Sequence, residues 1–176
     1  MSAVRRAEAR GQGGFTLVEL IIALALSGLL LTALTSVVLT AWRAGDTATS
    51  RIEASSQLRS FEAYAYDDFA LSDVSNLSGC TPSAPCSSPI TLNGTQASNA
   101  FPPVTNPSYQ VVYSWDQANR FLQRQVGGNP AVHAAVNVAA FSWFVDTNST
   151  VIVSLTVTVS AYSESQTFRF RPRLNP

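Results

Sequence analysis

Residues 13–20 read Gly-Gly-Phe-Thr-Leu-Val-Glu-Leu, and they lead into an apolar run. That run extends from Leu20 to Trp42, twenty-three residues without a charged side chain. Leu and Ala, which are good helix formers, dominate it, and it contains no proline. As an α-helix it would be roughly 34 Å long, enough to cross the hydrocarbon core of a membrane. We therefore predict a transmembrane N-terminal helix over residues 15–42.

The charges that flank this run fit a membrane boundary. The first fourteen residues carry three Arg against one Glu, a net charge of +2, and the remainder carries eight Arg against ten acids, or −2. A basic head before an apolar run keeps a terminus on the cytoplasmic side of the membrane. The run is also longer than the apolar core of a secretory signal peptide, which has roughly 7–15 residues.

Glu19 is the one carboxylate at the start of the apolar run. An ionised carboxylate on the apolar side of a membrane boundary costs several kcal/mol unless it finds a partner. One interpretation places Glu19 at the headgroup level, where water reaches it. The other requires a cationic partner from outside this helix.

The GGFTLVEL stretch behind a basic leader resembles the type III signal of prepilins and pseudopilins. In that family a membrane peptidase cuts after the glycine and methylates the new amino terminus. The resemblance implies that residues 1–14 are a cleaved leader peptide, that Gly14 precedes the cut, and that Phe15 becomes the N-methylated mature N-terminus. It also implies that prepilin peptidase is a partner.

The resemblance gives Glu19 a role in assembly. The ammonium created at Phe15 of a neighbouring subunit would neutralise this carboxylate and fix the axial register between subunits. Other pilin or pseudopilin subunits and an inner-membrane assembly platform are the partners implied. Many major pilins carry a proline in the membrane helix, so its absence here favours a minor pilin or a pseudopilin.

Beyond the membrane the helix is expected to continue over residues 43–71. Apolar residues recur there at spacings of three and four: Leu58, Phe61, Ala65 and Phe69. We predict one helix from about Phe15 to about Leu71, loosened near Gly45. The fold class is then α+β, a pilin fold in which a long spine helix packs on an antiparallel sheet of four or five strands.

Residues 72–176 are predicted to form a β-rich periplasmic head. Ser, Thr, Asn and Pro dominate residues 72–108 and indicate a loop. Cys80 and Cys86 lie in this loop and are expected to form a disulfide in an exported protein. A metal site is the alternative, but the chain has a single His and no second Cys pair, so we predict no metal.

Alternation of apolar and polar residues predicts the strands. They are expected near residues 90–92 and over 109–115, 120–126, 138–145, 150–162 and 166–171. The last is a candidate edge strand, protected by Arg169, Arg171 and Pro172. The Tyr-x-Trp-Asp at 113–116 and the Phe-Leu-x-Arg at 121–124 loosely resemble the minor pilins grouped as PilW-like and the J-type pseudopilins.

The sequence offers no catalytic constellation, and we predict neither enzyme activity nor a cofactor. His133 has no Ser or Cys with a supporting acid placed to recruit it, so a strand or loop position is expected. Asp67 and Asp68 point about 100° apart on a helix. They are therefore interpreted as a solvated helix face.

Arginines recur at short intervals in or just after two of the predicted strands and could form basic stripes. The first stripe holds Arg120 and Arg124, and the second holds Arg169, Arg171 and Arg173. The interleaved Phe121, Phe168 and Phe170 would allow single-stranded DNA binding by stacking. The chain has a formal net charge of zero, which instead favours a role in edge-strand solubility.

Three functions fit these observations. The first is a minor pilin in a type IV pilus-like filament that serves adhesion, motility or DNA uptake. The second is a pseudopilin of a type II secretion system, and the third is a single-span anchored binding domain that does not polymerise. In each case the N-terminus is expected in the cytoplasm, the helix in the inner membrane and the head in the periplasm, with the first two ending in a filament.

Overall fold

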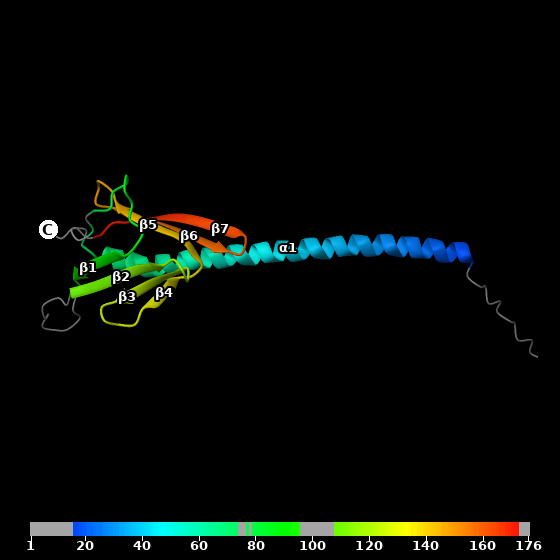
Figure 1. The fold of residues 1–176 in the computed structure, drawn as a ribbon, viewed down its shortest axis with the longest axis horizontal. Coiled ribbons are helices and arrows are strands. Elements are labelled where there is room, and N and C mark those ends of the chain that lie inside the picture. The colour runs from blue at the N-terminus through cyan, green and yellow to red at the C-terminus, as the bar shows by residue number, and fades with distance from the viewer. Residues whose placement is uncertain (1–15, 74–76, 78, 96–107, 173–176) are drawn as a thin grey trace, which may run out of the picture. The chain divides into compact units, whose positions relative to one another are not determined.

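A computed structural model describes residues 16–73, 77, 79–95 and 108–172. It contains one long helix, α1 (Leu17–Ala70), and seven strands, which are labelled in Figure 1. The helix continues without a break through Gly45, so the predicted loosening there is not observed. Residues 1–45 and residues 46–176 form two separate compact units.

The second unit holds the strands in two antiparallel sheets. The first sheet has the order β1-β2-β3-β4, with β1 at Ile90–Thr95, β2 at Ser108–Asp116, β3 at Phe121–Val126 and β4 at Val132–Ala135. The second has the order β5-β6-β7, with β5 at Val138–Val145, β6 at Val151–Val159 and β7 at Tyr162–Phe170. The α+β pilin-type arrangement of one long N-terminal helix with antiparallel strands is confirmed.

The number of strands and sheets differs from the prediction of one sheet with four or five strands. The chain leaves the first sheet at Val136 and Asn137, and Asn137 has a φ of 60°, in the left-handed region. Asn side chains tolerate this conformation better than most residues do. The reversal at Asn137 lets β5 begin a new sheet, and alternation along a strand does not reveal which partner that strand will choose.

Two further differences concern strand ends. The predicted strand over 150–162 is β6 followed by the start of β7, because Ser160 and Ala161 form a two-residue turn and Val159 pairs with Tyr162. Ser160 reaches a φ of 53°, which two-residue hairpin turns require. The four-residue strand β4 was not predicted, since it follows a proline and lacks a clear alternation.

The core of the second unit forms where the apolar face of α1 meets both sheets. Leu58, Phe61, Ala65 and Phe69 are all buried, as predicted from their spacing. The Phe61 ring contacts Phe168 edge to face at 5.1 Å between centroids. Phe69 stacks on Phe170 at 4.4 Å. The helix face is therefore held by aromatic rings from β7, each contact being worth about 0.5–1.5 kcal/mol beyond simple burial.

Candidate membrane and assembly site

The N-terminus of α1 is capped by Thr16. The Thr16 Oγ1 accepts a hydrogen bond from the backbone N–H of Glu19 at 3.3 Å, and the Thr16 carbonyl accepts from Leu20 N at 3.1 Å. Thr-x-x-Glu is the sequence pattern of a capping box, a signal that the sequence reasoning missed. The cap places the Glu19 carboxylate in the first helical turn, where the helix dipole favours a negative charge.

Gly14 and Phe15 lie outside the described residues, so their predicted roles are not tested by the structure. Their neighbour Thr16 is the first residue that the structure describes. The helix begins at Leu17, close to the predicted start near Phe15.

The first unit exposes an almost continuous apolar surface. Every large apolar side chain from Leu17 to Trp42 that the helix carries is at least 44% exposed. Within the described residues, α1 is the one helix long and apolar enough to cross a membrane. An exposed apolar patch of this size requires a membrane or a protein partner to cover it.

Four hydroxyl groups within this apolar surface are already satisfied. Thr32, Thr35, Ser36 and Thr40 each donate a hydrogen bond of 2.8 Å to a backbone carbonyl three or four residues earlier. An unsatisfied hydroxyl in hydrocarbon would cost several kcal/mol. These bonds make the stretch of helix from Thr32 to Thr40 compatible with an apolar surrounding.

The disulfide between Cys80 and Cys86 is present, with the two Cα atoms 5.4 Å apart. The ring that it closes pairs with the outer edge of β5. Cys86 exchanges two backbone hydrogen bonds with Trp143, of 2.9 and 2.8 Å, and Val145 N donates to the Cys80 carbonyl at 3.0 Å. The ring therefore covers an edge that would otherwise offer unpaired backbone groups to another chain.

A buried ion pair joins α1 to the first sheet. The Asp68 carboxylate is 1% exposed and accepts two hydrogen bonds of 2.6 Å from the Arg124 guanidinium. The Tyr113 hydroxyl donates to the same carboxylate at 2.5 Å. Burial, and then the Asp68 charge, raise the pKa of Tyr113 well above its ordinary value of 10.0. The phenol is therefore a neutral donor.

This contact corrects the interpretation of Asp67 and Asp68 as one solvated face. Asp67 is exposed, but Asp68 points into the core. The sequence held a signal for it, because Asp68 lies seven residues after Phe61 and three after Ala65, on the same buried face of the helix. A carboxylate at such a position needs a cation from another element.

Two of the three aromatic residues in the basic stripes are not available for stacking on bases. Phe168 and Phe170 belong to the core, with exposures of 5% and 6%. Phe121 stacks on His133 at 4.3 Å, which places the histidine on strand β4 as expected. Arg120 donates to the carbonyls of Asn137 and Thr158, so it joins the two sheets. Arg173 lies outside the described residues.

No group of three or more His, Cys, Asp and Glu side chains that could hold a metal ion occurs in the described part of the chain. The disulfide uses both cysteines of the sequence. The described residues therefore show a capped helix start, an apolar helix surface, and a head that is stabilised by a disulfide and an ion pair.

Comparison with known proteins identifies the N-terminal segment. Residues 9–35 match the family model described as the prokaryotic N-terminal methylation motif. This motif marks the type III signal of type IV pilin-like proteins, including pseudopilins, and it indicates a structural protein that prepilin peptidase processes and that assembles with other pilins. Together with the apolar helix it indicates membrane anchoring. Searches of curated proteins and of solved structures found no match to the chain.

Proposed function

We propose that this chain is a minor pilin, a structural subunit of a type IV pilus-like filament. The observation that carries the proposal is a methylation motif that runs directly into a helix with an exposed apolar surface. A filament core made of packed helices would cover that surface after it leaves the membrane. The lack of a proline between Leu17 and Ala70 supports a minor rather than a major subunit.

The proposed sequence of events begins with the leader. Prepilin peptidase removes residues 1–14 after Gly14 and methylates Phe15, while residues 15–42 hold the chain in the inner membrane. The cap at Thr16 supports this step, because it fixes the start of α1 at Leu17, on the C-terminal side of the proposed cut. An inner-membrane assembly platform then moves the subunit into a filament.

Glu19 is proposed to pair with the Phe15 ammonium of a neighbouring subunit. Because an unpaired charge in an apolar bundle is costly, only the register that brings the two groups together is stable. A pseudopilin of a type II secretion system would use the same chemistry. Deleting the gene and scoring both piliation and secretion separates these two systems.

Processing can be tested with Gly14→Val in the full chain. We expect the variant to accumulate as precursor, to lack an N-methylated Phe15 by mass spectrometry and to be absent from sheared filaments. Gly28→Ala is a matched control, since an added Cβ there meets nothing within 4 Å. A Gly14→Val chain that still matures at Phe15, or still enters filaments, contradicts the proposal in favour of a simple anchored domain.

A further inference from the structure

The outer face of the second sheet carries a regular array of hydroxyl groups. Alternate residues of a strand share one face, so neighbouring positions on β6 and β7 meet side by side. Three cross-strand pairs form hydrogen bonds of 3.2, 2.9 and 2.9 Å: Ser154 with Thr167, Thr156 with Ser165, and Thr158 with Ser163. We call these pairs the hydroxyl ladder. Each pair uses one hydroxyl hydrogen, so the second hydrogen and several lone pairs remain for a ligand.

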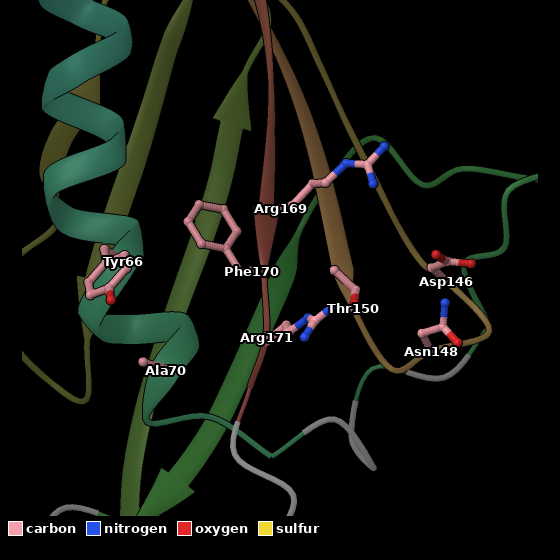
Figure 2. Close-up of a pocket in the computed structure, with 8 residues that line it drawn as sticks. All are labelled: Tyr66, Ala70, Asp146, Asn148, Thr150, Arg169, Phe170 and Arg171. Carbon is pink, nitrogen blue, oxygen red and sulfur yellow. The ribbon is translucent and has the colours of Figure 1, made fainter.

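Two arginines continue this face beyond the ladder. Arg169 lies opposite Ile152 in the same register, and Arg171 follows two residues later; both side chains are exposed. Figure 2 shows both guanidinium groups on the side of β7 away from Phe170, whose ring points toward α1. In the described part of the chain, neither arginine forms an ion pair with a carboxylate.

The arginines line a cleft of about 470 Å³ at the end of the second sheet. Asn148 and Thr150 line it from the turn between β5 and β6, together with Asp146. The Asp146 Oδ1 accepts from the Thr147 N–H at 2.6 Å and from its hydroxyl at 3.1 Å. Two cations against one acid leave the cleft with a local charge of +1, in a chain whose formal net charge is zero.

We propose that this cleft and the hydroxyl ladder bind an acidic polysaccharide. Guanidinium groups recognise carboxylates through paired hydrogen bonds, so Arg169 and Arg171 would hold the carboxylate of a uronic-acid residue. The amide of Asn148 and the second carboxylate oxygen of Asp146 match the ring hydroxyls of the same residue. The neighbouring sugars would lie along the ladder, hydroxyl to hydroxyl. This role goes beyond filament assembly, which does not require a ligand at the head.

Single-stranded nucleic acid is a poorer match to the same surface. Such binding combines many cations with aromatic platforms on which bases stack. The cleft supplies two cations, Arg169 and Arg171, and a single exposed ring, Tyr66. The hydroxyl ladder carries neither cations nor rings, and Phe168 and Phe170 are buried. The array of neutral hydroxyls instead fits a polymer rich in hydroxyl groups.

The proposal can be tested by calorimetric titration of the full chain in detergent micelles with trigalacturonate. We expect saturable binding that falls at least about tenfold in the double variant Arg169→Gln/Arg171→Gln, because two charge-assisted contacts are lost. Arg59→Gln makes a matched control, since Arg59 is also exposed but lies on α1. Neutral maltotriose should not bind.

The ladder has a separate readout. Hexagalacturonate should bind more tightly than the trimer, and Ser165→Ala/Thr167→Val should weaken hexamer binding by a larger factor than trimer binding, so that most of this advantage is lost. The proposal is overturned if trigalacturonate does not bind, if the arginine variant binds it as wild type does, or if oligothymidylate binds more tightly than the uronate. None of these results depends on processing at Gly14, so a failure here leaves the filament proposal intact.

Discussion

Asp68 and Arg124 meet in a two-pronged ion pair, with both contacts at 2.6 Å, although one residue lies on the spine helix and the other on strand β3. The Arg124 guanidinium also lies 5.3 Å from the centre of the Tyr64 ring. The pair therefore links the helix to the first sheet at a fixed position. The Asp68 carboxylate is buried and the Arg124 guanidinium is partly buried, so the loss of either member costs more than forming the pair gains.

Asp68→Asn should destabilise the head by about 3 kcal/mol, because the partly buried Arg124 guanidinium would lose the Asp68 charge. Denaturant unfolding followed by tryptophan fluorescence measures this change. Asp67→Asn is the adjacent control: the side chain is exposed, and its substitution should stay within about 0.5 kcal/mol of wild type. Equal effects of the two substitutions would show that the pair does not hold the helix to the sheet.

The raised pKa of Tyr113 predicts a loss of stability at alkaline pH. Above the ordinary pKa of 10.0 the unfolded chain releases this proton while the folded chain keeps it. Stability from this group is therefore complete below pH 10.0 and falls as the pH rises beyond it, by about 1.4 kcal/mol per pH unit. Tyr113→Phe should remove this part of the slope in unfolding measured between pH 9 and about 11.5. An unchanged slope would contradict the assignment.

Gly94→Ala should disturb the junction between the end of the helix and β1. A Cβ at this position would lie 2.0 Å from the Leu71 carbonyl oxygen, so the backbone of one segment must move. The expected cost is about 1–3 kcal/mol of unfolding free energy, as for other forced backbone shifts. Gly128→Ala, where an added Cβ meets nothing within 4 Å, should be close to neutral in the same measurement.

The disulfide ring should contribute about 2 kcal/mol of stability, because it closes a loop of only a few residues. Cys80→Ser/Cys86→Ser should lower the unfolding free energy by that amount and increase hydrogen exchange at Val145 N, which donates to the Cys80 carbonyl. In exported wild-type protein, thiol labelling without a reductant should fail at both cysteines. Labelling at either one would show that the bond does not form in the cell.

Glu19→Ala should leave membrane insertion and cleavage intact but reduce incorporation into filaments. The carboxylate is removed while the Phe15 amine is still produced, so the proposed pair cannot form. Quantifying the subunit in sheared filaments measures this effect. Glu62→Ala removes an exposed acid farther along α1 and controls for the loss of charge. Normal incorporation of Glu19→Ala would refute the pairing.

The sequence predicted the helix well because two physical signals agree along it. The uncharged run to Trp42 and the spacing of Leu58 and Phe61 both indicate helix, and α1 ends at Ala70, one residue from the predicted end. Strand β5 was also predicted with its observed bounds, since it lies between clear breaks in the chain.

Other features were not predictable from local pattern. The turn at Ser160 carries no glycine or asparagine, so nothing in the run of β-forming residues marks a reversal. The division into two sheets depends on which strands pair, and the alternation of apolar and polar residues within one strand does not identify its partner strand. Asp68 illustrates a third case, because its partner Arg124 lies 56 positions away in the chain.

The internally bonded hydroxyls of Thr32, Thr35, Ser36 and Thr40 have a consequence for movement. A hydroxyl that already donates to a backbone carbonyl of its own helix needs no hydrogen-bond partner on a neighbouring molecule. It therefore does not favour one rotation of the helix about its axis over another. The apolar part of α1 can therefore rotate and slide among lipid tails and neighbouring helices, because its interaction energy with them depends little on its orientation. Contacts at the capped N-terminal end and contacts of the head would then set the final rotation of the helix about its axis.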